Sequence, residues 1–152
     1  MIWFTADWHL GEQRLDLLQR PFDGSEEMVE TLVANHNKRV APGDHVYVIG
    51  DALYRHAEKQ WLRHLLRFNG RLRLLRGNHD RPFSDSDYYM FDEIVPEGEG
   101  QVLDLGNGFQ VNLVHYPALA RSDMFNLTGP RLELFARTRR EGWDGWGDEY
   151  PS

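Results

Sequence analysis

The sequence contains no cysteine, which excludes disulfides, thiolate metal sites and cysteine nucleophiles together. Any metal ion must therefore be held by imidazole, carboxylate, amide or backbone oxygen. No apolar run approaches the roughly 20 residues of a membrane-spanning helix. The first residues also lack the basic region and apolar core of a signal peptide. We therefore expect a soluble, cytoplasmic protein with no membrane partner.

Basic residues are in the minority, with 17 Lys and Arg against 24 Asp and Glu and a formal net charge of -7. This balance argues against a protein that coats long nucleic acid through counterion release. A nucleotide or a short nucleic-acid end remains a possible ligand. The length of 152 residues suits a single domain over residues 1–152. The sequence does not indicate an oligomeric state.

The first half of the chain alternates between strand and helix patterns. Apolar runs at 1–7, 45–51 and 71–80 predict buried strands, and amphipathic stretches at 24–40 and 57–68 predict helices. Such alternation is typical of parallel strands joined by right-handed crossovers. Farther along, residues 101–105 and 109–117 read as two strands around a glycine turn. Together these patterns predict an α/β fold with a mixed sheet and outer helices.

Polar side chains follow the predicted strands at the point where each strand ends. They are Asp7 and His9, then Asp51, then Asn78, His79 and Asp80, and finally His115. Because parallel strands present their carboxyl ends at one edge of a sheet, we expect these residues to converge. Oxygen and imidazole donors suit divalent Mn, Fe, Ni, Zn or Mg without selecting sharply among them. Asp51 lies between the other groups in sequence and is the natural bridge between two cations.

These residues carry a family resemblance. The motifs are "DWH" at 7–9, "GD" at 50–51, "GNHD" at 77–80 and "VHYP" at 114–117. As a set they resemble the calcineurin-like metallophosphoesterase superfamily. The "RPF" at 20–22, the "EEM" at 26–28 and the "GD" turn at 43–44 are similar to its small bacterial and phage branch. The resemblance extends from residue 1 to about residue 129.

The resemblance implies a four-layer α/β/β/α sandwich with mixed sheets and a site for two divalent metal ions. Manganese is the expected metal, with iron, nickel, zinc or magnesium as alternatives. By the family pattern, Asp7 and His9 hold the first ion and Asp51 bridges. Asn78 and His115 then hold the second ion.

The same resemblance implies hydrolysis of a phosphomonoester or phosphodiester by metal-bound hydroxide. His79 would donate a proton to the leaving oxygen or stabilise the phosphoryl charge, and Asp80 would orient His79. Tyr54 and Arg55 follow the "GD" motif and are candidate contacts to the substrate phosphate. The expected substrate is a phosphate-ester small molecule or a nucleotide.

One family motif is absent from its expected place. A Gly-His-x-His should complete both metal sites, but here Pro130 and Leu132 occupy the histidine positions, and residues 130–152 are divergent. His56 is the first candidate for a substitute ligand, although its position favours a solvent-facing histidine at the start of a helix. This departure keeps a second hypothesis open, a weakly active or inactive member that binds a phosphate-bearing ligand or a protein partner. A third hypothesis is a nuclease acting on short nucleic-acid ends.

Overall fold

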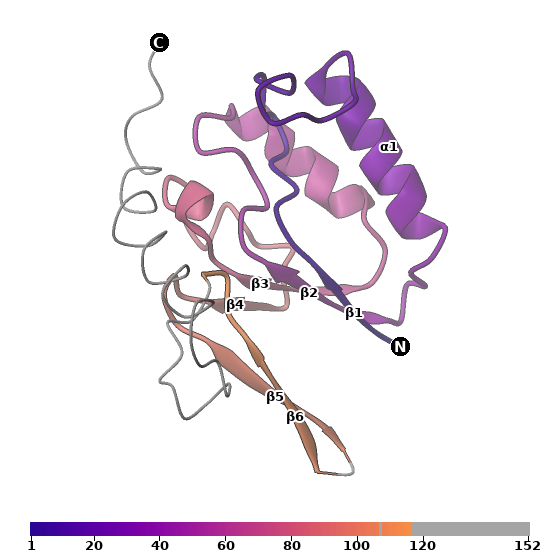
Figure 1. The fold of residues 1–152 in the computed structure, drawn as a ribbon, viewed down its shortest axis with the longest axis vertical. Helices are drawn as coiled ribbons and strands as arrows, with labels where there is room; N and C mark the ends of the chain where they lie inside the picture. Colours follow the sequence, from indigo (N-terminus) through magenta and orange to yellow (C-terminus); the bar gives the residue numbers. More distant parts are fainter. Residues whose placement is uncertain (107, 117–152) are drawn as a thin grey trace, which may run out of the picture. The chain divides into compact units, whose positions relative to one another are not determined.

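The computed structural model describes residues 1–106 and 108–116, which belong to one unit, Met1–Tyr116. Its elements in chain order are β1 (Ile2–Thr5), α1 (Ser25–Asn37), β2 (His45–Ile49), η1 (Lys59–Arg67), β3 (Arg71–Leu75), η2 (Asn78–Asp80), β4 (Glu93–Val95), β5 (Gln101–Gly106) and β6 (Phe109–Leu113) (Figure 1). Within these residues, no helix combines the length and apolar character needed to cross a membrane.

The predicted parallel sheet is confirmed, and its strand order is β1-β2-β3-β4. In its register Phe4 lies opposite Tyr47, and Tyr47 lies opposite Arg73. Strand β4 was not predicted, because its three residues are too short to show a periodicity. Its parallel pairing with β3 extends the sheet edge at which the polar motifs gather.

Strand β1 is shorter and less buried than its apolar sequence predicts. Among the described strands it pairs only with β2 and therefore forms an edge of that sheet, and Ile2 and Phe4 are 40% and 44% exposed. The strand ends at Thr5, because the backbone reaches left-handed conformations at Asp7 and His9 and leaves the sheet. The chain therefore enters the candidate site as a loop.

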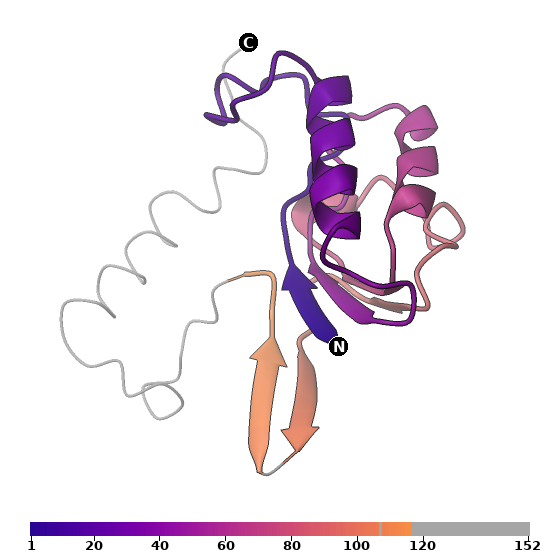
Figure 2. The ribbon, with the colours of Figure 1, turned by 90° about the vertical axis from the view of Figure 1, so that its right-hand side faces the viewer.

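The sheet carries helices on one face and a hairpin on the other (Figure 2). Val46 and Val48 of β2 point into the core shared with α1 and η1. The intervening Tyr47 packs with Leu113 of the hairpin. This alternation follows from the two-residue period of a strand with both faces covered. The predicted helix at 57–68 is present as the 3₁₀ helix η1, whose Trp61 N–H donates to the Glu58 carbonyl at 3.0 Å.

The second sheet is the antiparallel pair β5 and β6, as predicted from the glycine turn. Among the described residues each sheet is of one kind, so the mixed sheet we expected is not found. The reason is that β4 continues the parallel sheet, whereas the two hairpin strands pair with each other and with no other described strand. The described layers are helices, parallel sheet and hairpin, and they do not include a second helical layer. Residues 117–152, with the divergent stretch 130–152, lie outside the described residues.

Candidate metal centre

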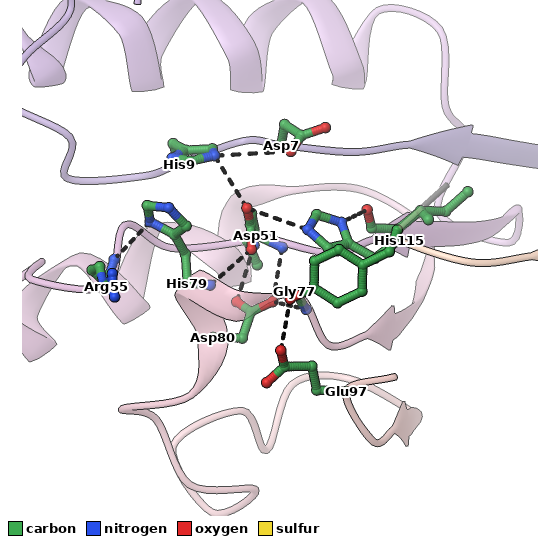
Figure 3. Close-up of polar contacts among 12 residues, drawn as sticks. Asp7, His9, Asp51, Arg55, Gly77, His79, Asp80, Glu97 and His115 are labelled. Atoms are coloured by element: carbon green, nitrogen blue, oxygen red, sulfur yellow. Dashed lines mark hydrogen bonds and ion pairs between the residues drawn. The ribbon is translucent and has the colours of Figure 1, made fainter. Parts of the chain in front are cut away.

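The polar residues that follow the strands converge around Asp51 (Figure 3). His9 Nε2 lies 3.4 Å from Asp51 Oδ2 and 3.8 Å from Asp7 Oδ1. His115 Nε2 approaches Asp51 Oδ2 from another side at 3.5 Å. The convergence predicted from the parallel strand ends is therefore found for these four residues.

Two groups of potential ligands share Asp51. One group is His9, Asp51 and His79, and the other is Asp7, Asp51 and His115. In each group the donor atoms lie within 4.8 Å of one another. A carboxylate common to two such groups is suited to bridge two cations. The grouping differs from the expected one, because His79 lies beside His9 where the resemblance assigns it no ligand role.

Three of these residues have an uncommon backbone conformation. The φ angles of Asp7, His9 and Asp51 are 54°, 49° and 56°. Residues other than glycine rarely adopt positive φ, which costs on the order of 1–3 kcal/mol each. Backbone hydrogen bonds hold them there, since Asp7 N–H donates to the Gly50 carbonyl at 3.0 Å and His9 N–H to the Asp51 carbonyl at 2.9 Å. Such strain clusters at sites where it aims functional side chains.

The glycines of the "GD" and "GNHD" motifs leave room for the ligands. A Cβ atom on Gly77 would lie 2.1 Å from Asp51 Oδ1 and 2.7 Å from His115 Nε2. A Cβ atom on Gly50 would lie 2.0 Å from His115 Nδ1, and Gly50 also has a φ of +80°. No side chain fits at either position without displacing the cluster, so both glycines are required by the site itself.

The electrostatics of the cluster favour a cation. Burial raises the pKa of the Asp51 carboxyl, but hydrogen bonds with His115 and His9 outweigh burial and hold that pKa below its usual value. Burial lowers the pKa of His115, but the hydrogen bond and charge of Asp51 outweigh it and raise that pKa to about 9. A proton on His115 thus partly neutralises charge that a divalent ion would neutralise more fully.

The side chains present fit a divalent metal. His115 Nδ1 lies 2.9 Å from the Ile49 carbonyl, so Nδ1–H donates to that oxygen and Nε2 is directed at the cluster. A metal-binding histidine commonly has one nitrogen held in this way. The remaining donors are carboxylates and a second imidazole, which suit Mn, Fe, Ni, Zn or Mg.

His79 is held as a neutral hydrogen-bond donor. Its Nδ1 accepts the backbone N–H of Arg55 at 3.3 Å, which assigns the proton of the neutral ring to Nε2. Burial lowers the pKa of His79 to about 4, and the charge of Asp51 acts in the opposite direction. The ring lies 4.5 Å from the His9 ring and 5.4 Å from the Tyr54 ring.

Asp80 has a different partner from the one predicted. Its Oδ2 accepts the N–H groups of Asp51 at 2.8 Å and Gly77 at 2.9 Å. Its Oδ1 accepts the N–H of Ala52 at 3.1 Å and the hydroxyl of Tyr88 at 2.6 Å. These four donors occupy the carboxylate, so Asp80 holds the two ligand loops and does not orient the His79 ring.

The other predicted residues lie around the cluster. Asn78 is half-buried at the first position of η2, and its role as a ligand stays a prediction. Tyr54 is buried, and the guanidinium carbon of Arg14 lies 5.1 Å from its ring centre. Arg55 is half-buried beside His79. His56 is exposed and belongs to neither ligand group of the described residues, which agrees with a solvent-facing histidine and not with a substitute ligand. Both Pro130 and Leu132 lie outside the described residues.

Sequence reasoning missed Arg20 as a support of the site. Its Nη2 donates to the Asp7 carbonyl at 2.5 Å and its Nη1 to the Trp8 carbonyl at 2.9 Å. The guanidinium therefore holds the loop that carries Asp7 and His9 in its left-handed conformation. The "RPF" motif contained Arg20, but nothing in its local sequence indicates which carbonyl groups it reaches.

Comparisons with known proteins identify the family of this chain. The model of the calcineurin-like phosphoesterase family matches residues 1–146. An uncharacterized protein of Methanocaldococcus jannaschii is 35% identical over 82 residues, which cover 53% of this chain and 47% of that protein. The gene 66 protein of Mycobacterium phage L5 is 34% identical over 85 residues, which cover 53% of this chain and 40% of that protein. The matches thus span less than half of either curated relative.

A solved structure shows a similar fold. The crystal structure of a protein of unknown function from Aquifex aeolicus aligns with a TM-score of 0.63 and 26% identity, over 92% of this chain and 72% of that one. The phage relative agrees with the small phage-type branch suggested by the motifs. The family match covers nearly the whole chain and includes every residue of the cluster around Asp51, and the chain therefore belongs to the calcineurin-like phosphoesterase family.

Proposed function

We propose that the protein is a metal-dependent phosphoesterase that hydrolyses a phosphomonoester or phosphodiester. The observation that carries this proposal is Asp51, a buried carboxylate shared by two groups of potential metal ligands. A small phosphate ester or a nucleotide is the proposed substrate. The net charge of -7 does not favour a long nucleic-acid duplex.

Two divalent ions, with manganese the first choice, are proposed to occupy the site. Asp7, His9, Asp51, Asn78 and His115 would hold them. When bound, such ions activate a water molecule and neutralise charge on the phosphoryl group. The complete fold is proposed to be a four-layer α/β/β/α sandwich. The described order of helices, parallel sheet and hairpin supports this proposal.

His79 is the proposed proton donor to the leaving oxygen. Because Arg55 N–H occupies Nδ1, the neutral ring presents Nε2–H, which would hydrogen-bond to the leaving oxygen or to phosphoryl oxygens. Transfer of a proton to the leaving oxygen would require the imidazolium form of the ring. Tyr54 forms one wall beside His79, and Arg55 is proposed to contact a substrate phosphate from the same side. In this proposal these residues orient the substrate and its leaving oxygen, while the carboxylate, imidazole and amide ligands hold the ions.

The test measures metal content and hydrolysis separately. Protein stripped with a chelator is reloaded with manganese, metal is counted by elemental analysis, and cleavage of nitrophenyl phosphate and its diester is measured. We expect His79→Gln to lower kcat by about 10²–10⁴-fold with manganese retained. Asp51→Asn should lose manganese and activity together, because it removes the shared carboxylate. His64→Gln on η1, where the ring packs 5.3 Å from Trp61, is the matched control and should match the wild type.

Each alternative has its own result. Protein that binds no manganese and cleaves neither ester would refute the proposal and favour the inactive ligand-binding member. Cleavage of the diester and of short oligonucleotides without cleavage of the monoester would favour the nuclease. Equal activity of wild type and His79→Gln would remove His79 from the mechanism.

A further inference from the structure

Two ligand loops are tied together by carboxylates that each accept hydrogen bonds from the other loop. Asp51, in the loop after β2, accepts the backbone N–H of His79 at 2.9 Å through Oδ1. Asp80, in the loop after β3, accepts the backbone N–H groups of Asp51 and Ala52. These reciprocal hydrogen bonds fix the distance between two loops. One loop carries the bridging carboxylate Asp51, and the other carries Asn78 and His79.

Asp80 is fully buried, so its position depends on its donors. Three of them are backbone N–H groups of the two loops, and the fourth is the hydroxyl of Tyr88 at 2.6 Å. Tyr88 is the one donor that belongs to neither loop. An ionised carboxylate accepts such bonds strongly, and removing one donor from a buried acceptor weakens the whole set.

Tyr88 is itself held rigidly. It is fully buried, and its ring centre lies 5.7 Å from that of Phe83 and 5.5 Å from that of Phe91. The guanidinium carbon of Arg76 lies 5.2 Å from the Tyr88 ring centre, and Arg76 Nη1 donates to the Asp80 carbonyl at 2.8 Å. The hydroxyl therefore reaches Asp80 from a fixed direction, set by the packed segment that precedes β4.

We propose that Tyr88 is a positioning residue that acts through Asp80 to hold Asp51 and the loop of Asn78 in the geometry that binds divalent metal. The inference rests on the proposed metal site and adds to it a residue with no ligand atom in the site. Supports of this kind, one step removed from the metal, change metal affinity by about 10–100-fold when they are lost.

The test is Tyr88→Phe, which removes one oxygen and keeps the packed ring. Titration calorimetry with manganese chloride alone should show at least about tenfold weaker binding. Tyr47→Phe is the matched control, because Tyr47 is also buried and its hydroxyl makes no hydrogen bond to any described residue. Its manganese affinity should equal that of the wild type.

Urea unfolding of both variants separates positioning from a general loss of stability. A merely structural Tyr88 would lower the unfolding midpoint and leave the manganese Kd of the folded protein unchanged, which would overturn the proposal. Hydrolysis is not needed for this readout. Manganese binding without any esterase activity would refute the proposed function and leave the role of Tyr88 standing.

Amide hydrogen exchange of the wild-type protein is a second test, and it does not require any variant to fold. If Asp80 holds both loops, the N–H groups of Asp51 and Gly77 should exchange as slowly as those of β2 in metal-free protein. Exchange as fast as that of exposed loops would show that the connection through Asp80 does not form, and would overturn the proposal.

Discussion

Replacing Gly77 by alanine should destroy metal binding while leaving a folded protein. The added Cβ atom would lie 2.1 Å from Asp51 Oδ1, 2.7 Å from His115 Nε2 and 2.8 Å from the Asp51 nitrogen. Gly77 has a φ of -98°, which alanine tolerates, so the effect is one of space and not of backbone strain. The substitution therefore acts directly on two proposed ligands.

The magnitude follows from these contacts. Asp51 Oδ1 must withdraw by about 0.9 Å, from 2.1 Å to the 3.0 Å below which real Cβ contacts essentially never occur. Functional sites tolerate displacements of about 0.5 Å. With two ligands displaced, manganese affinity should fall by at least about 100-fold. Overpacking destabilises a folded protein by about 1–3 kcal/mol. Alanine in place of glycine stabilises it by about 0.4–1 kcal/mol, because the unfolded chain has fewer conformations. The free energy of unfolding should therefore fall by about 1–2 kcal/mol.

Calorimetry with manganese and urea unfolding measure the two effects. Gly43→Ala is the control, because a Cβ atom at Gly43 meets nothing within 4 Å and its φ is not in the left-handed region. This control should bind manganese as the wild type does and be equally or slightly more stable. Manganese binding by Gly77→Ala at wild-type affinity would show that Asp51 and His115 are not the ligands, and would refute the reasoning.

Two other predictions concern residues that support the site or the core. Arg20→Lys cannot bridge the Asp7 and Trp8 carbonyls with a planar fork, so manganese affinity should fall about tenfold in calorimetry. Arg39→Lys, in the exposed turn after α1, is the control and should have no effect. Burial lowers the pKa of His36 below its unfolded value of 6.5, although a hydrogen bond to the Asn69 carbonyl acts in the opposite direction. The unfolded chain therefore binds this proton more readily, and stability should fall as the pH drops below 6.5. Urea midpoints at about pH 7 and pH 5.5 should show a smaller decrease for His36→Gln than for the wild type, and equal decreases would contradict the assignment.

Much of the fold was predictable because it depends on local patterns. The strands near residues 2–5, 45–49 and 71–75 and the hairpin at 101–113 carry apolar runs or a glycine turn that a sequence displays directly. The short β4 was missed because three residues cannot show a period. The exposed face of β1 was missed because an edge position depends on which strands become neighbours, which no strand sequence specifies by itself.

The candidate site was likewise predictable from the sequence only in part. Asp7, His9, Asp51 and His115 were identified because polar residues at the ends of parallel strands meet at one sheet edge. The role of Asp80 was predicted wrongly, because adjacency to His79 in sequence does not determine where a side chain points in a tight turn. The carboxylate turns instead toward backbone N–H groups of a loop that is 28 residues away.

The sequence by itself determined the donor chemistry of this protein, because the absence of cysteine leaves oxygen and imidazole, and its motifs indicated the family. Tertiary structure alone decided which groups share Asp51 and how the ligand loops are held. It placed the Arg20 guanidinium on two carbonyls, the Tyr88 hydroxyl on Asp80 and the Arg55 N–H on His79. Those contacts join segments far apart in the chain, and their geometry arises only once the sheet and its loops have packed.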